Sequence, residues 1–204
     1  MLFCLSSLVA SQGTEWKKIN EAGETAYQRA EYGEAEKHFR AALAEAEKLA
    51  AQDAALATIL KRLTFCLVAQ GKSDEAEPVL RRLFAIQQKV LPADNPEIAD
   101  SLNLLSLLTR AQRLGADDPD VAASLNNLAE LYRNQGKYAE AEPLYRRSLA
   151  IREKALGRDH PDVAQSLEDC AKLLRQLKRD TEAAKLEERA RAIRAKHGGT
   201  KATK

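Results

Sequence analysis

The stretch Asp118–Gly157 begins again, in altered form, directly after it ends, and this repetition constrains the fold more than any other feature. Both copies open with the sequence Pro-Asp-Val-Ala, the first at Pro119 and the second at Pro161. A repeat of this length is typical of stacked supersecondary units, because one such unit cannot bury its apolar side alone. The sequence therefore predicts an array of stacked units, whose function depends on the surface that the stack presents.

The composition indicates that these units are helical. Ala, Leu, Glu, Lys and Arg, which are strong helix formers, are abundant, and aromatic residues make up only 5% of the chain. Few segments alternate apolar and polar residues in the way of a half-buried strand. We therefore predict an all-α fold, a right-handed α-solenoid of antiparallel helical hairpins with about nine helices.

Helical periodicity and turn signals divide the chain into five units, of which the third is incomplete. Pro96 and Pro119 open two similar helices that start much closer together than those of Pro119 and Pro161, and the shortfall matches the length of one second helix. Either the array is split near residues 92–118, or the helix over 96–113 covers the end of a half-array. The predicted segments are an apolar leader or cap (1–13), repeat 1 (14–52), repeat 2 (53–91), a half repeat (92–117), repeat 4 (118–157), repeat 5 (158–197) and a disordered tail (198–204).

Capping residues mark several of the predicted helix starts. Asn95 and Asp118 each precede a proline, which suits the first helical position because its missing N–H has no partner there in any case. His160 stands in the same place before Pro161, so we predict a structural rather than a catalytic role for it. Asp53 is the predicted N-cap of the first helix of repeat 2.

The N-terminus supports two interpretations. Residues 1–10 are mostly apolar, and small residues follow at Ala10 and Ser11, as at a secretory cleavage site, but no basic residue precedes the apolar run. The segment is either a truncated signal peptide or a short helix that covers repeat 1. The first reading predicts export and the second a cytoplasmic protein, and the run is too short for a stable membrane span.

No pattern in the sequence indicates a cofactor or a metal. The three cysteines form no CxxC pair and no cluster with histidine, so Cys66 and Cys170 are predicted to be small buried apolar residues. The three histidines lie in distant segments, and the chain has no glycine-rich phosphate loop, HExxH or GxSxG motif. We expect no cofactor, no metal and no enzymatic activity.

The repeat resembles a known family. The runs Ser-Leu-Asn-Asn-Leu-Ala-Glu-Leu-Tyr (124–132) and Gln-Gly-Lys-Tyr-Ala-Glu-Ala-Glu-Pro-Leu-Tyr (135–145) are similar to the tetratricopeptide repeat, in the 42-residue form of kinesin light chain and its bacterial relatives. The resemblance covers about residues 15–197 and is strongest in 118–157. It implies a non-enzymatic scaffold that binds a protein or peptide in a concave groove lined by the first helix of each repeat.

Carried onto this sequence, the resemblance places eight residues in that groove. One groove position holds Arg110, Arg133 and Arg175 in three successive first helices, and such a row would favour an acidic ligand. A second, shorter row holds Asn103 and Asn126. The alternative is that these arginines are merely solvated and recur because the repeat was duplicated. The predicted groove residues are Asn103, Arg110, Asn126, Asn127, Glu130, Arg133, Asn134 and Arg175.

Three other functions remain to be weighed against peptide binding. The apolar run Leu104, Leu105, Leu107 and Leu108 could lie uncovered where the second helix is missing and cause self-association. Helical repeats can also bind RNA. However, 32 basic residues against 30 acidic ones give no general case for nucleic acid or for an anionic membrane. An enzyme is the fourth and least supported reading.

Overall fold

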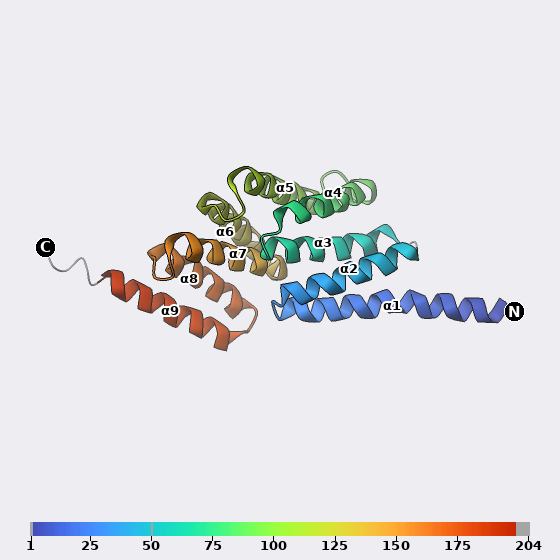
Figure 1. Cartoon of the computed structure of the whole chain (residues 1–204), viewed down its shortest axis with the longest axis horizontal. Coiled ribbons are helices and arrows are strands. Elements are labelled where there is room, and N and C mark those ends of the chain that lie inside the picture. The colour runs from blue at the N-terminus through green and yellow to red at the C-terminus, as the bar shows by residue number, and fades with distance from the viewer. Residues whose placement is uncertain (1, 50, 199–204) are drawn as a thin grey trace. The chain divides into compact units, whose positions relative to one another are not determined.

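The chain folds into helices joined by short turns (Figure 1). The computed structural model describes residues 2–49 and 51–198, and the side chains from residue 15 onward. Within this described part there are nine helices and no strand, as predicted. The helices are α1 (Leu2–Gln28), α2 (Tyr32–Lys48), α3 (Asp53–Ala69), α4 (Ser73–Val90), α5 (Pro96–Leu114), α6 (Pro119–Asn134), α7 (Tyr138–Leu156), α8 (Pro161–Gln176) and α9 (Asp180–Gly198).

The chain divides into two compact units, Met1–Thr109 and Arg110–Lys204, so that the boundary falls within α5. In the first unit the extensive contacts join α1 to α2, α2 to α3 and α3 to α4. In the second unit they join α6 to α7, α7 to α8 and α8 to α9. Packing of each helix against its neighbours in sequence is the arrangement of a helical repeat solenoid, which confirms the predicted fold class.

The same tight turn closes the hairpin four times. The residue two places before α2, α4, α7 and α9 has a positive φ, and it is Ala30, Gly71, Gly136 or Lys178. The next residue donates its backbone N–H to a carbonyl one turn earlier, as Lys137 does to Tyr132 over 2.8 Å. This six-to-one bond is the Schellman termination of a helix, which requires a left-handed residue at that point. Glycine, which adopts this conformation without strain, occupies the position in two of the four turns, at Gly71 and Gly136.

The helix starts follow the capping signals with one exception. The side chains of Asn95 and Asp118 accept the N–H of the residue two places on, at 2.9 and 2.8 Å. His160 does the same through Nδ1, at 3.2 Å from the nitrogen of Asp162, which confirms its structural role. Asp53 was predicted to be an N-cap, but α3 begins at Asp53 itself and Gln52 occupies the cap.

At three places a serine near the start of one helix forms a hydrogen bond with a polar side chain of the helix before it. In the first unit Ser101 of α5 donates to Gln87 of α4 over 2.6 Å. In the second unit Arg110 of α5 donates to Ser124 of α6 over 2.8 Å, and Arg152 of α7 donates to Ser166 of α8 over 2.7 Å. The earlier part of α5 therefore meets α4 as a first helix does, and its last turn meets α6 as a second helix does, so one helix takes both roles.

The apolar run of α5 is not the uncovered face that the sequence suggested. Leu104, Leu107 and Leu108 are buried and Leu105 is half-buried. The exposed leucines of α5, Leu102 and Leu114, lie outside this run. The self-association reading thus loses the exposed apolar stripe on which it depended.

Two predicted segments lie wholly or partly outside the described residues. The leader or cap (1–13) has a described backbone from residue 2, which belongs without interruption to α1, but its side chains and Met1 are outside. The tail beyond Gly198 lies outside as well. No helix of the described part is long and apolar enough to cross a membrane.

Candidate functional site

One stripe of α6 is open to solvent and combines polar with apolar side chains. Asn127, Glu130, Leu131 and Asn134 follow one another at the three- and four-residue spacing of a helix face, and all four are exposed. Leu131 is 41% exposed, so its apolar side chain is open to a partner. We call these four residues the α6 stripe. Three of them were predicted groove residues.

Two further predicted residues lie beside the stripe but deeper. Asn126 is half-buried, and its Oδ1 has no hydrogen-bond partner among the described residues. Arg133 is only 20% exposed, and its guanidinium lies 3.6 Å from the carboxylate of Glu130. Burial raises the pKa of the Tyr145 phenol to about 12, although a hydrogen bond from Arg133 acts in the opposite direction. Arg133 therefore binds groups of its own unit and is not an open cation in a groove.

Arg175 is also occupied. Its Nε and Nη2 donate to the carboxylate of Glu187 on α9, at 3.1 and 2.9 Å, and its Nη1 donates to Asp180 at 3.1 Å. The hydrogen bond to Glu187 is the main reason that the pKa of Arg175 is raised, and it lowers the pKa of Glu187 in turn. The guanidinium therefore joins α8 to α9 within one hairpin.

The three arginines of the predicted row all have partners within the chain. Arg110 donates to Ser124 on the next helix, whereas Arg133 and Arg175 bind groups of their own repeats. The three residues recur in sequence, but each meets different neighbours. Because these guanidinium groups have partners within the chain, they no longer give the main argument for an acidic ligand in this groove.

The groove face does not extend to α5 in the predicted form. Asn103 is exposed but belongs to the first unit, while Asn126 belongs to the second. When Pro96 is aligned with Pro119, the α6 stripe corresponds to four residues of α5 that are all buried, namely Leu104, Leu107, Leu108 and Ala111. The positions that face solvent on α6 are thus core positions on α5.

The equivalent positions on α8, one repeat further along, are more charged. Asp169 and Lys172 pair with each other at 3.0 Å, Leu173 is buried, and Gln176 is exposed. Glu168, at the position of Asn126, receives two hydrogen bonds from Arg194 of α9, at 2.5 and 2.8 Å. Of the three helices α5, α6 and α8, α6 is the one that presents two exposed amides, Asn127 and Asn134, at these positions.

Sequence reasoning missed Leu131. The resemblance directed attention to polar residues, and a leucine at helical spacing is usually assigned to the core. The spacing could have indicated it, since Leu131 lies one helical turn after Asn127 and one before Asn134, and therefore on the same face of the helix as these predicted groove residues. Only its exposure in the folded chain separates it from the buried Leu128 and Leu125.

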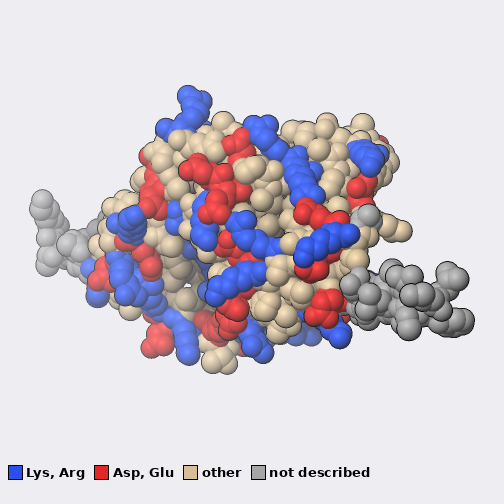
Figure 2. Space-filling view, turned by 45° about the vertical axis from the view of Figure 1, so that its right-hand side comes forward, with Lys and Arg blue, Asp and Glu red and all other residues tan. Residues whose placement is uncertain are grey.

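Other features of the second unit offer no catalytic arrangement. A crevice of about 50 Å³ between α7, α8 and α9 is lined mainly by apolar side chains, among them Cys170 and Leu173. Both Cys66 and Cys170 are buried, as predicted. Among the described residues no three His, Cys, Asp or Glu side chains are grouped so as to hold a metal. On the face seen in Figure 2, basic and acidic side chains are intermixed and form no single basic field.

Part of the second unit also matches a known protein family. Residues 120–196, which include α7, α8 and nearly all of α6 and α9, match the family model described as "Tetratricopeptide repeat". This part of the chain is similar to tetratricopeptide repeats. The resemblance stated from the sequence is thereby confirmed for α6–α9.

Two solved structures have a likeness to the chain that is a similarity alone. One is a putative kinesin light chain with nearly identical TPR-like repeats from Podosopora anserina, at 24% identity and a TM-score of 0.42, over 90% of this chain and 97% of that one. Another is BtubC (BKLC) from P. vanneervenii, at 20% identity and a TM-score of 0.41, over 96% and 92% of the two chains. A search of curated proteins gave no match to this sequence.

Proposed function

We propose that this chain is a non-enzymatic scaffold that binds a peptide or a helix of a partner protein on the α6 stripe. Tetratricopeptide repeats in general mediate protein–protein interaction. The observation that carries the proposal is the exposure of Leu131 between Asn127 and Asn134, at positions whose equivalents on α5 are buried. An apolar side chain that a partner can cover, flanked by amides that can both donate and accept hydrogen bonds, suits an extended peptide or an amphipathic helix.

Asn126 supports the same surface. Its Oδ1 is shielded from water and lacks a partner among the described residues, which costs free energy in the unbound chain. A backbone N–H of a bound peptide would satisfy it. The ligand suited to this face is therefore polar and uncharged around one apolar anchor, in contrast to the acidic ligand that the arginine row suggested.

The proposal is tested by photo-crosslinking and a matched pair of variants. A photoreactive side chain at position 131 should capture the partner, and the same group at the exposed position 188 on α9 should not. With the purified partner, Leu131→Glu should weaken binding by roughly 1–3 kcal/mol, the usual cost of losing a buried apolar anchor and leaving a charge in its place. If Leu131→Glu and Asn127→Ala both bind as tightly as the parent chain, the α6 stripe is not the binding surface.

A further inference from the structure

The open end of each hairpin in the second unit is closed by an ion pair between its second helix and the segment before its first helix. In the α6–α7 hairpin this pair joins Lys154 to Asp117. In the α8–α9 hairpin Lys196 lies 2.7 Å from Asp159, in the equivalent place of the next repeat. We call each of these arrangements a clasp.

An arginine completes both clasps. Arg147 donates to the carbonyl oxygen of Ala116 over 2.8 Å in the first, and Arg189 donates to the carbonyl oxygen of Arg158 over 3.1 Å in the second. The two hairpins therefore share a Lys–Asp ion pair and an Arg–carbonyl hydrogen bond, although Arg147 also pairs with Asp117 and Arg189 pairs with Glu153. The first hairpin closes without the residues that are found only in the second clasp, so closure does not require them.

Three positions of the second clasp differ from the first, and each difference adds a basic or titratable side chain. Two alanines are replaced by an arginine and a histidine, and an aspartate is replaced by a histidine. The pairs are Ala116 and Arg158, Asp118 and His160, and Ala155 and His197. The last clasp thus gains one fixed positive charge and two imidazoles and loses one carboxylate.

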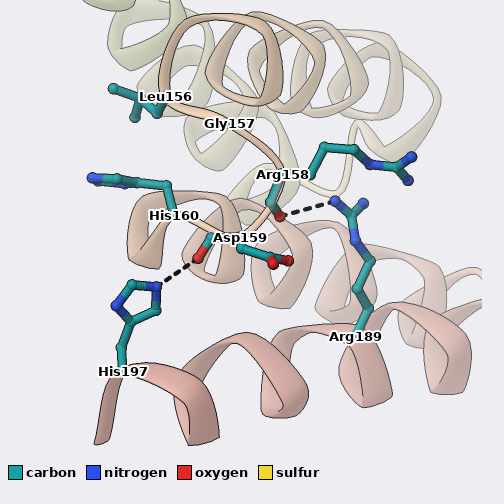
Figure 3. Close-up of a pocket in the computed structure, with 7 residues that line it drawn as sticks. All are labelled: Leu156, Gly157, Arg158, Asp159, His160, Arg189 and His197. Carbon is teal, nitrogen blue, oxygen red and sulfur yellow. Dashed lines mark hydrogen bonds between the residues drawn. The ribbon is translucent and has the colours of Figure 1, made fainter. Parts of the chain in front are cut away.

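These three side chains line one hollow. It has a volume of about 660 Å³ and lies around the segment 157–160 and the C-terminal half of α9 (Figure 3). The imidazoles of His160 and His197 lie toward one end of this segment, and the guanidinium groups of Arg158 and Arg189 toward the other. Leu156, 38% exposed, forms an apolar part of the lining.

The basic groups retain hydrogen-bonding capacity toward a ligand. His160 accepts a backbone N–H at Nδ1, which leaves Nε2 as a donor. His197 uses Nε2 at 2.8 Å from the carbonyl oxygen of Asp159, which leaves Nδ1 unused. Within the described chain the Arg158 guanidinium has no hydrogen-bond or ion-pair partner.

The carboxylates beside the hollow have basic neighbours, including the exposed Asp162, whose Oδ2 lies 3.8 Å from Nδ1 of His160. Lys196 pairs with Asp159, and that hydrogen bond is the main reason that the pKa of Asp159 lies below its usual range. Arg189 binds the carboxylate of Glu153. The charge left for a ligand is therefore positive.

We propose that this hollow is a second docking site, separate from the α6 stripe, that binds an acidic peptide segment containing an apolar residue. Acidic side chains would meet Arg158 at one end and the two imidazoles at the other, over a span that one small anion would not fill. The apolar residue would cover Leu156. The proposal does not depend on the function assigned to α6.

The three histidines of the chain make a local reporter for this binding. The probe is a capped synthetic peptide of glutamates around one leucine, titrated into the full chain while the histidine side-chain signals are followed by NMR. The signals of His160 and His197 should shift saturably, and that of His38 on α2 should not. Absence of a shift, or equal shifts at all three histidines, would overturn the proposal.

The three residues that differ in the second clasp can be replaced by those of the first clasp. This variant loses the added basic groups but should keep the contacts that close the hairpin. The triple variant Arg158→Ala, His160→Asp and His197→Ala should bind the peptide about tenfold more weakly, since each exposed charge pair contributes about a two- to fivefold effect. Lys185→Ala, an exposed basic residue of α9 outside the hollow, is the matched control and should bind as the parent does. Equal binding by the triple variant, or tighter binding of polyuridine than of the peptide at the same salt, would refute the acidic-peptide site.

Discussion

Glu142 on α7 is the charged residue whose loss should damage the repeat stack most. It is only 7% exposed. Its carboxylate receives two hydrogen bonds of 2.8 Å from Arg179, in the turn between α8 and α9, and two of 2.9 and 2.7 Å from Arg146 on its own helix. Removing one partner of a buried pair costs roughly 3–5 kcal/mol, because the remaining charge stays buried without compensation.

The expected cost of Glu142→Ala is lower than that range. The side chains of Arg146 and Arg179 are partly open to water, at 39% and 23% exposure, so solvent can compensate part of the lost interaction. We expect Glu142→Ala to lower the free energy of unfolding by about 2–3 kcal/mol, and Glu142→Gln, which keeps some hydrogen bonds, by about half of that. Urea denaturation followed by circular dichroism at neutral pH measures both.

The matched control is Glu188→Ala, which removes an exposed carboxylate from α9 and should change the stability by less than about 0.5 kcal/mol. A double-mutant cycle of Glu142→Ala with Arg179→Ala should give a coupling energy of at least about 1 kcal/mol. If Glu142→Ala is as mild as Glu188→Ala, or if the cycle shows no coupling, the contact between α7 and the following turn does not stabilise the stack in the way argued.

Two further predictions concern titration and reactivity. Burial alone would raise the pKa of Glu36, but hydrogen bonds from Lys72, Arg40 and Gln70 outweigh it and the pKa is lowered. The stability from this carboxylate is therefore fully present above its unfolded pKa, near 4.3, and is lost as pH falls through the folded value, so Glu36→Gln should flatten the loss of stability between about pH 5 and pH 3. A slope unchanged by the substitution would contradict this account. Burial raises the pKa of the Cys170 thiol to about 12, so it should resist alkylation by iodoacetamide at pH 8 in the folded chain and react in urea. Alkylation at equal rates in both states would show that the thiol is accessible.

The helices themselves could be predicted closely from the sequence. Pro96, Pro119 and Pro161 begin α5, α6 and α8 as expected, and the number of helices in the described part agrees with the predicted number of about nine. These features are local, because capping, proline at the first position and left-handed turns act over a few residues. The fold class follows from them together with the repeat.

The candidate site could be predicted only in part. The resemblance selected Asn127, Glu130 and Asn134, which lie on an exposed face of α6, but it treated residues at one repeat position as equivalent. Arg133 and Arg175 share that position, and one lies half-buried near Tyr145 while the other is held by Glu187. Side-chain partners come from neighbouring helices, which differ from one repeat to the next.

By itself, therefore, the sequence determined the elements of this protein: its helices, their turns and caps, and the missing second helix of the third unit. Tertiary structure decided which face of each helix is exposed. Leu104 and Asn127 occupy one repeat position, yet the first is core and the second is surface, because α5 and α6 have different neighbours. Burial and charge pairing depend on neighbours that local periodicity does not specify, and these neighbours left Leu131 open to solvent and bound the Arg175 guanidinium to Glu187.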